Sequence, residues 1–497
     1  MILQNKVTKI TKLKCFYIML IMLIVNLTYS YYVMNGRASL ELTYDKIPFS
    51  IMVLSWLGII TLLCCLYTWK KLRNEYIGAY TVFLLILFLF CYGQSICWIF
   101  GLENFYKNLL LRESVEFIIK SQVYTLLFIN LFHIGALFFS RNDYMIEEKN
   151  QFEESDNKAL YTVGIIILLI SLPAFLINIF STIELVINYG YGGLYNNKPN
   201  YSRIVNILMY ASKYFEPAII CILVSKYNNK KIRKILLCIF LLNVVINLYI
   251  GGRSGAAVSV LCIICISHYL IKPINFKRVI IYSIVGYLFI GALSATAMFR
   301  GQAHRGISDF ITVFFSSGLD SVSNLIGELG WSMTSIGYTM NFVPSIEGFR
   351  LGSTYLYGLF TIIPNLGFWD IHPSTVNAQL GNWLQDMLNI SYGPGYTMIA
   401  ESYINFSWWG LGVALILGGI IGYVLSRVNR ETAKYKLSST AFIMVLLSIG
   451  LKPLVRSCSV VAFREIIYVG GGIYILYRFI RISYRKKYLN KIKKQGV

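Results

Sequence analysis

The chain is built from a series of apolar runs long enough to cross a bilayer, separated by polar segments. A helix needs about 20 apolar residues to span the hydrocarbon core of a membrane. Hydrophobic residues make up 56% of the 497 residues and charged residues only 14%. No soluble domain of this length could bury so much apolar surface. The sequence therefore predicts an all-α polytopic membrane protein.

Twelve of these runs are predicted to be membrane spans. They cover residues 15–33, 48–68, 77–100, 118–140, 159–180, 203–225, 235–250, 255–271, 279–298, 405–425, 439–455 and 461–480. This assignment divides the chain into nine helices over 1–298, one large loop over 299–404, and three helices with a basic tail over 405–497. A loop of that length in a compact protein is usually functional.

The basic residues predict the orientation in the membrane. The formal net charge is +22, and most of the 45 lysines and arginines fall in the N-terminal segment, the tail and alternate short loops. Cytoplasmic loops of membrane proteins are enriched in these residues. Both termini are therefore predicted to be cytoplasmic and the 299–404 loop external. Topology and anionic lipid account for the charge, so nucleic acid is not expected as a partner.

The cysteines and histidines do not form a recognisable metal or disulfide pattern. The ten cysteines are scattered, nearly all within apolar runs, and the chain has only four histidines. The one CxxC pair near a histidine, Cys262 and Cys265 before His268, lies inside an apolar run, and no DxD or P-loop motif is present. The sequence predicts neither a metal site nor a cofactor.

Positively charged side chains recur on the predicted external side. The planar guanidinium group of arginine suits phosphate oxygens, so several of these residues together could bind a diphosphate. Arg253 is the foremost candidate, because the glycines around it in GGRSG allow close approach of a ligand. Each arginine could instead cap a helix, reach toward headgroups or pair with Glu401 or Glu465. The set comprises Arg253, Arg300, Arg305, Arg350, Lys452, Arg456 and Arg464.

Acid–base candidates in the large loop are few. His372 follows Asp370 by two residues, and a carboxylate at that spacing could orient the imidazole as a general base. The same spacing also occurs in ordinary loop networks. Glu401 lies where the tenth predicted span begins. It could act as a base, or it could be a helix N-terminal charge that the helix dipole favours. His304 is a further candidate.

Three motifs together resemble a known family. They are GGRSG at 251–255, HPS at 372–374 within the long late loop, and GYTMIAESYINFSWWGLG at 395–412. This combination resembles the Wzy-type polymerases of O-antigen and capsule repeat units. The overall layout covers nearly the whole chain.

The resemblance implies a GT-C-like integral-membrane glycosyltransferase that polymerises lipopolysaccharide or capsule units. Such an enzyme joins oligosaccharides carried on undecaprenyl diphosphate at the outer face of the bacterial cytoplasmic membrane. It implies metal-independent catalysis with external arginines, here Arg253, Arg300, Arg305 and Arg456, on the diphosphate. His372, Glu401 and Asp370 are then the catalytic candidates. A flippase and a chain-length regulator of the same pathway are the implied protein partners.

Other functions remain open at this point. A lipid-linked oligosaccharide flippase would have a similar number of spans, but the 299–404 loop is long for a transporter of that class. An O-antigen ligase would share the external arginines. A protein glycosyltransferase would need an acidic pair in the first external loop, where Glu41 and Asp45 lie.

Overall fold

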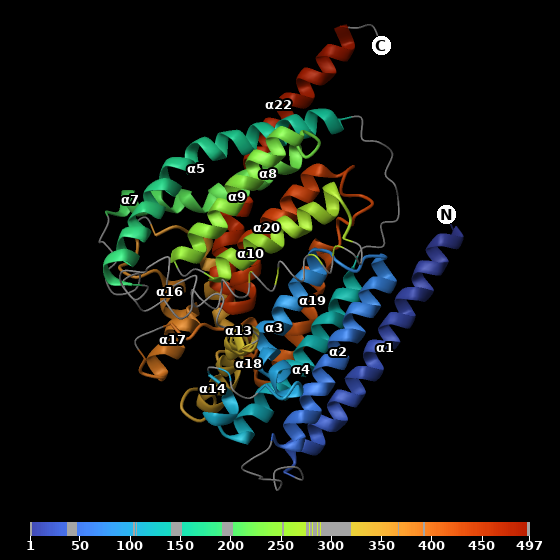
Figure 1. The fold of residues 1–497 in the computed structure, drawn as a ribbon, viewed down its shortest axis with the longest axis vertical. Helices are drawn as coiled ribbons and strands as arrows, with labels where there is room; N and C mark the ends of the chain where they lie inside the picture. The colour runs from blue at the N-terminus through green and yellow to red at the C-terminus, as the bar shows by residue number, and fades with distance from the viewer. Residues whose placement is uncertain are drawn as a thin grey trace. The chain divides into compact units, whose positions relative to one another are not determined.

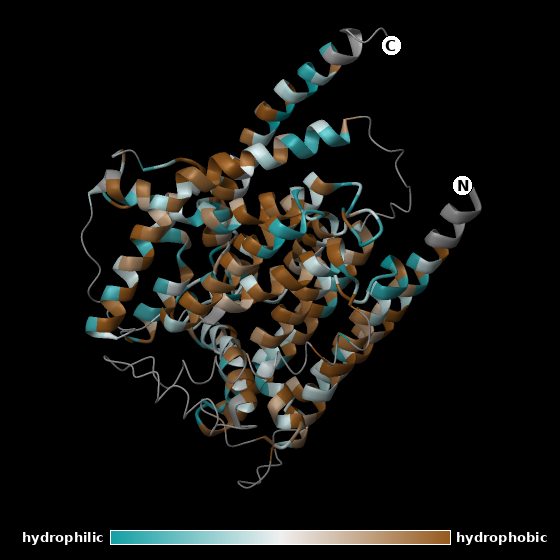
Figure 2. Cartoon of the chain, turned by 45° about the horizontal axis from the view of Figure 1, so that its top comes forward, coloured by the Kyte–Doolittle hydropathy of each residue, from teal (hydrophilic) through white to brown (hydrophobic). Residues whose placement is uncertain are grey.

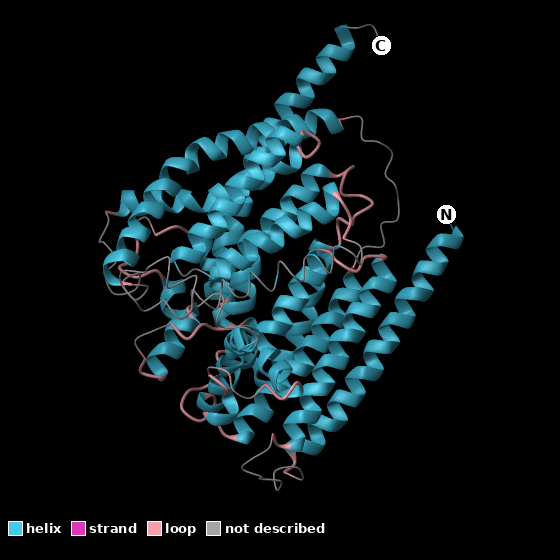
Figure 3. Cartoon of the chain, in the orientation of Figure 1, coloured by secondary structure: helices cyan, strands magenta, loops and turns pink. Residues whose placement is uncertain are grey.

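The computed structural model of the protein describes residues 2–36, 47–102, 105, 107–140, 152–190, 202–250, 253–274, 278, 281, 286, 289, 320–365, 367–390 and 393–494. This part of the chain folds into helices and connecting loops, without a strand (Figure 3). Helices pair all their backbone groups internally, which a segment in lipid requires. The predicted all-α class is confirmed for these residues.

The chain forms two compact units. The first comprises Met1–Tyr144, Ser323–Arg427 and Pro453–Arg464, and the second comprises Met145–Val322, Val428–Lys452 and Glu465–Val497. Each unit is therefore assembled from three separate stretches of sequence. The sequence-based division at 298 and 404 follows predicted topology rather than compactness and stays a prediction.

In the first unit, the four long N-terminal helices pack together with α19 (Figure 1). The helices of the late loop also belong to this unit. The N-terminal helices are α1 (Ile2–Met34), α2 (Phe49–Arg73), α3 (Ala79–Ile99), η1 (Leu109–Leu111) and α4 (Val115–Phe139). The later ones are α13 (Asp320–Gly330), η4 (Trp331–Met333), α14 (Thr334–Phe342), α15 (Ser353–Leu359), η5 (Phe360–Ile362), α16 (Pro373–Ala378), α17 (Leu380–Met387), α18 (Met398–Phe406), η6 (Ser407–Gly410), α19 (Leu411–Leu425) and α21 (Ser459–Glu465).

Glycines allow α4 and α19 to pack with their backbones in contact. A Cβ atom on Gly418 of α19 would lie 1.8 Å from the carbonyl oxygen of Phe132, and one on Gly135 of α4 would lie 2.1 Å from that of Leu415. Small residues at such crossings are typical of membrane helices, because lipid provides little hydrophobic driving force between them. Close van der Waals packing therefore holds this pair together.

The second unit contains the remaining long helices. They are α5 (Glu153–Tyr189), α7 (Arg203–Tyr210), η2 (Ala211–Tyr214), α8 (Phe215–Ser225), α9 (Lys230–Ile250), α10 (Arg253–Ile266), η3 (Ser267–Ile271), α20 (Leu437–Arg456), η7 (Ile466–Gly471) and α22 (Gly472–Lys494). The helix α20 belongs to this unit up to Lys452 and to the first unit from Pro453 onward.

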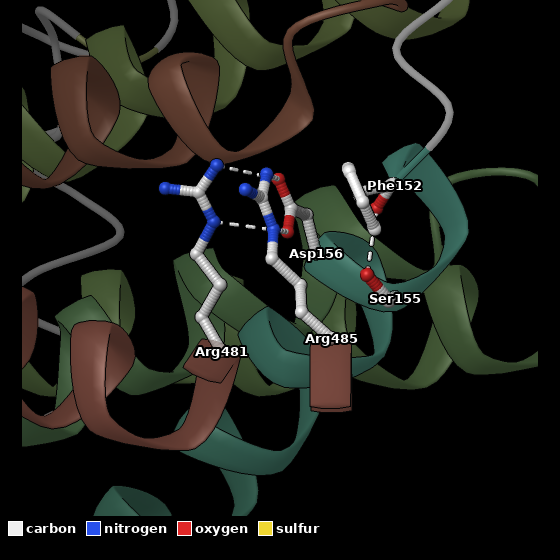
Figure 4. Close-up of polar contacts among 5 residues, drawn as sticks. All are labelled: Phe152, Ser155, Asp156, Arg481 and Arg485. Atoms are coloured by element: carbon white, nitrogen blue, oxygen red, sulfur yellow. Dashed lines mark hydrogen bonds and ion pairs between the residues drawn. The ribbon is translucent and has the colours of Figure 1, made fainter. Parts of the chain in front are cut away.

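An ion-pair cluster joins α5 to α22 within the second unit (Figure 4). The carboxylate of Asp156 accepts two hydrogen bonds from Arg481, both 2.9 Å, and two from Arg485, at 2.8 and 2.7 Å. Paired bonds of this kind are among the stronger polar contacts in proteins. They fix the start of α5 against the basic end of α22.

Ten helices in the described part of the chain are long and apolar enough to cross a membrane, and Figure 2 shows the long helices mainly in brown. Each coincides with one of the predicted spans. The predicted span at 255–271 corresponds to a shorter apolar helix, Gly255–Ile271. The predicted span at 279–298 lies almost entirely outside the described residues. The count of twelve and the GT-C-like loop domain therefore stay predictions.

Candidate functional site

Glu401 lies in the first turn of α18 and is completely buried in the first unit. The side chain of Thr397 caps this helix by accepting a hydrogen bond of 3.1 Å from the backbone N–H of Ala400. A carboxylate in the first turn is favoured by the helix dipole. Local sequence therefore explains why α18 begins here and why an acid is tolerated at its start.

The Glu401 carboxylate links three segments of the first unit. The hydroxyl of Thr354 in α15 donates to Oε1 at 2.9 Å, and the hydroxyl of Ser459 in α21 donates to the same oxygen at 2.6 Å. The backbone N–H of Ser459 donates to Oε2 at 2.6 Å. An ionised carboxylate away from water is costly unless it is hydrogen-bonded. These three donors satisfy the carboxylate. Through them, α18 is connected to α15 and to α21.

Asn405 extends the same network on α18. Its side-chain amide donates to the Thr354 hydroxyl at 2.7 Å, and its Oδ1 accepts from the backbone N–H of Gly352 at 2.9 Å. Gly352 has a φ of +88°, in the left-handed region that favours glycine. The turn before α15 is therefore held directly against the end of α18.

Arg456 lies three residues before Ser459 and is half-buried. Its guanidinium Cζ is 5.6 Å from the centroid of the Phe90 ring, and its carbonyl oxygen accepts a hydrogen bond of 3.5 Å from the backbone N–H of Tyr396. The structure thus places Arg456 and Ser459, a partner of Glu401, on one short stretch of chain. A cation over an aromatic face is attracted by the electron-rich face of the ring.

Other ionisable groups near Glu401 are protonated at neutral pH. Burial raises the pKa of the Tyr355 and Tyr396 hydroxyls well above their usual value. Burial also raises the pKa of the Cys458 thiol to about 11. None of the three can accept a proton as a general base in these forms. Glu401 is the remaining acidic group of this cluster.

His372 is the N-cap of α16 in the same unit. Its Nδ1 accepts hydrogen bonds from the backbone N–H and the hydroxyl of Ser374, at 3.1 and 2.7 Å. Its Nε2 lies 2.9 Å from the carbonyl oxygen of Ile363, so Nε2 carries the proton that is donated there. The lone pair of the ring then lies on Nδ1. It is partly exposed, unlike Glu401.

Asp370 does not orient His372. It is exposed and has no hydrogen-bond or ion-pair partner among the described residues. The ring beside His372 is that of Trp369, with centroids 5.1 Å apart. Ile363 and Ser374 therefore fill the orienting positions that the sequence suggested for the aspartate.

The other arginines of the predicted external set have different surroundings. Arg350 pairs with Glu347 at 3.1 Å, and Glu347 also accepts from the indole N–H of Trp383 at 3.1 Å. Arg464 is half-buried, and its Nε has no hydrogen-bond partner within the described residues. Lys213 pairs with Glu465 in the second unit. The Nε of Arg464 is therefore unsatisfied, whereas Arg350 is already paired with a carboxylate.

The side chains of three predicted diphosphate-binding residues lie outside the described part of the structure. Arg253 begins α10 in the second unit, but its side chain lies outside the described part. Arg300 and Arg305 lie outside the described residues altogether, as does His304. Their predicted roles are unchanged.

Sequence reasoning missed the neutral partners that hold the candidates in place. Thr354, Asn405 and Ser459 surround Glu401, and Ser374 contacts His372. Serine, threonine and asparagine are common, and nothing in their local sequence marks them. The HPS triplet at 372–374 did contain Ser374, but the spacing alone gave no role for its hydroxyl.

Comparison with known families finds a match over residues 6–488 to the model described as O-antigen polysaccharide polymerase Wzy. Searches of curated proteins and of solved structures find no match. The family match covers nearly all of both compact units and confirms the resemblance drawn from the three motifs. The chain belongs to the O-antigen polysaccharide polymerase Wzy family.

Proposed function

We propose that this membrane protein polymerises oligosaccharide repeat units carried on undecaprenyl diphosphate, at the outer face of the bacterial cytoplasmic membrane. The observation that carries this proposal is the family match across residues 6–488. The helical architecture, with ten helices able to span a membrane in the described part, supports a lipid-linked substrate. The charge distribution supports cytoplasmic termini and an external late loop.

The proposed reaction is a glycosyl transfer between two lipid-linked units. A hydroxyl oxygen of the acceptor sugar attacks the anomeric carbon of the donor chain. The bond from that carbon to the diphosphate oxygen breaks, and the lipid diphosphate leaves with the electron pair. The acceptor hydroxyl loses its proton to a base of the protein. The donor is already activated by its diphosphate, so no nucleotide is needed outside the cell.

We assign stabilisation of the leaving diphosphate to arginines rather than to a metal. Arginine remains charged at any physiological pH and can bind phosphate oxygens through two parallel N–H groups. Preorganised positive charge at a developing anion is worth several kcal/mol in a site shielded from water. Arg456, held half-buried beside Phe90, has the surroundings that this role requires. Arg253, Arg300 and Arg305 are proposed for the same role.

Two residues are proposed for the base. His372 is partly exposed, and its Nδ1 faces the backbone N–H and the hydroxyl of Ser374, so it can act as a base once these bonds are exchanged for the acceptor hydroxyl. The Glu401 carboxylate connects more segments of the fold than His372 does, but it is buried and already accepts three hydrogen bonds. His372 is therefore the first choice and Glu401 the second. Asp370, which is exposed and two residues from His372, is the third.

Arginine variants test the proposal in cells. Arg253→Ala and Arg456→Ala should each abolish long polymer chains while the protein remains in the membrane, because a positive charge at the diphosphate is lost. The corresponding lysine variants should recover only part of the chain length, since lysine lacks the planar fork. Arg427→Ala is the matched control, because Arg427 lies just past the end of α19, is exposed, and donates from its guanidinium to the Tyr423 hydroxyl.

The readout is polymer length on a gel, normalised to the amount of inserted protein. Wild-type chain length in both alanine variants would contradict the assignment of the arginines. The same assay identifies the base, since its removal should lower the rate by about 100-fold or more. His372→Ala and Glu401→Gln are the variants to compare, and unchanged rates in both would direct attention to Asp370.

A further inference from the structure

The segment from α15 to α16 exposes many large apolar side chains, although it belongs to the predicted external loop. Leu356 is 64% exposed, Ile362 52% and Val376 64%. A group of apolar side chains this large is unusual on a surface that faces water. The full set comprises Leu356, Leu359, Phe360, Ile362, Ile363, Phe368, Ile371 and Val376.

The interior face of the same segment is polar or small. Thr354 and Thr361 are buried, and Ser374 in α16 is also buried. Gly358 and Ala378 occupy the other inward positions. A helix on the surface of a soluble protein buries its apolar stripe and exposes its polar residues. The α15–α16 segment has the opposite arrangement.

Membrane-spanning helices of the first unit show this same arrangement. In α1, Asn26 and Ser30 are buried while Ile21, Ile24 and Leu27 are exposed. In a bilayer the exposed surface contacts acyl chains, so apolar residues belong outside and polar residues find partners inside. The surface of α15–α16 is therefore of the kind that contacts lipid.

The next helix of the loop provides an internal contrast. In α17, Leu380 and Leu384 are buried, while Asn382 and Asp386 are exposed. This is the arrangement expected against water. The change between the two arrangements falls at residue 379, between α16 and α17.

The packing of α15 places it beside the end of a membrane span. Gly358 faces Phe463 of α21, and the ring of Tyr355 stacks with that of Phe406, with centroids 6.4 Å apart. Phe406 is followed by Trp408 and by Trp409, which is 88% exposed at the start of α19. Tryptophan is enriched where helices cross the membrane–water interface. In addition, no lysine or arginine occurs between residues 351 and 426.

We infer that the exposed apolar side chains of α15, η5 and α16 are inserted among the acyl chains of the bilayer leaflet that the loop faces, while the polar turn that carries Asp370 lies at the headgroup level and α17 lies in water. His372, at the start of α16, is then held at the level of the lipid headgroups. The inference rests on side-chain exposure and packing within the first unit. It does not depend on the proposed polymerase reaction or on which side of the membrane the loop occupies.

Spin-label accessibility in proteoliposomes tests this inference. Single cysteines are introduced at Leu356, Ile362 and Val376, with Asn382 and Asp386 as matched controls from α17. The background is a Cys64→Ser/Cys238→Ser variant of the full chain, because these are the natural cysteines that are not buried. Each nitroxide-labelled protein is exposed to oxygen, which concentrates in lipid, and to a water-soluble nickel chelate.

Labels at Leu356, Ile362 and Val376 should collide at least several-fold more often with oxygen than with the nickel chelate, and the α17 controls should show the reverse. Nickel accessibility equal to that of the controls would overturn the inference and place the segment in water. Low accessibility to both reagents, with spin–spin broadening that disappears on dilution with unlabelled protein, would also overturn it and assign the surface to a second copy of the chain. Size-exclusion profiles confirm that each variant is folded.

Discussion

At the scale of single residues, the Glu401 carboxylate connects three separate stretches of the first unit. It receives two hydroxyl donors and one backbone N–H from residues 47 and 58 positions away in the sequence. Leaving a buried donor or acceptor unpaired costs about 1–3 kcal/mol, and more for a charged group. The position of Ser459, and with it that of Arg456, therefore depends on this one side chain.

Glu401→Gln should destabilise the protein. The amide of glutamine carries two N–H donors, so one of the three donors around residue 401 would face another donor instead of an oxygen. The expected loss is about 1–3 kcal/mol. It should appear as a lower thermal unfolding midpoint of the detergent-purified protein, and Ser459→Ala should lower the midpoint by a smaller amount because it keeps the carboxylate.

Asp386→Asn provides the control, since Asp386 is an exposed acid on α17 of the same unit. A midpoint for Glu401→Gln as high as that of the control would contradict the structural role described for the carboxylate. A loss of polymerisation in Glu401→Gln that far exceeds the loss in Ser459→Ala would favour the additional role as base.

The sequence was sufficient to single out Glu401, His372 and Arg456, because charge is rare near a membrane and conspicuous where it occurs. It could not supply their partners. Thr354 and Ser459 meet Glu401 only when α15, α18 and α21 have packed together. Asp370 was the expected partner of His372 because it is near in sequence, whereas the fold brings Ile363 and Ser374 to the two ring nitrogens.

At the scale of helices, the contact between α4 and α19 depends on the absence of side chains. Gly418, Gly422 and Gly135 all lie where a Cβ atom would come within 3.0 Å of the facing helix. Because lipid solvates apolar side chains as well as another helix does, such a pair gains its stability from close packing. The apolar run at 405–425 predicted a span, but it could not identify α4 as the helix against which that span packs.

Gly418→Ala should therefore be strongly destabilising, since the new methyl group would lie 1.8 Å from the carbonyl oxygen of Phe132. The two helices would have to separate, at a cost of about 1–3 kcal/mol or more. Gly412→Ala, in the same helix, has no other atom within 4 Å of the new carbon and should be neutral or slightly stabilising.

The two variants can be compared by fluorescence-detected size exclusion after a series of heating steps. Both substitutions make the same chemical change, so a lower midpoint for Gly418→Ala than for Gly412→Ala would support the close packing of α4 and α19. Equal midpoints for Gly418→Ala and Gly412→Ala would show that α4 and α19 do not pack as described.

Helix boundaries illustrate what periodic apolarity can and cannot predict. Ten predicted spans coincide with helices long enough to cross a bilayer, because membrane helices are marked by length and apolarity alone. The sequence divided the chain at the edges of the long loop, whereas compactness groups Ser323–Arg427 with the N-terminal helices. Long-range packing of this kind leaves no periodic signal.

At the scale of the whole molecule, the orientation in the membrane determines where the chemistry takes place. Cysteines introduced at Asn229 and Asn490 should be protected from an impermeant thiol reagent in intact cells, whereas one at Asn382 should be labelled. All three residues are exposed, so burial does not limit their reaction. After permeabilisation all three should react, which serves as the control. Labelling of Asn229 and Asn490 alone in intact cells would reverse the orientation and contradict an external site.

The most direct test of the account is chain elongation by the purified protein. The protein is reconstituted in liposomes with a lipid-diphosphate oligosaccharide repeat unit and excess EDTA, and products are separated by length. If external arginines stabilise the leaving diphosphate, elongation should proceed at the same rate with and without the chelator. Elongation that stops in EDTA and resumes when magnesium or manganese is added would contradict the arginine-based mechanism. No elongation under either condition, from folded protein, would contradict the proposed polymerase function itself.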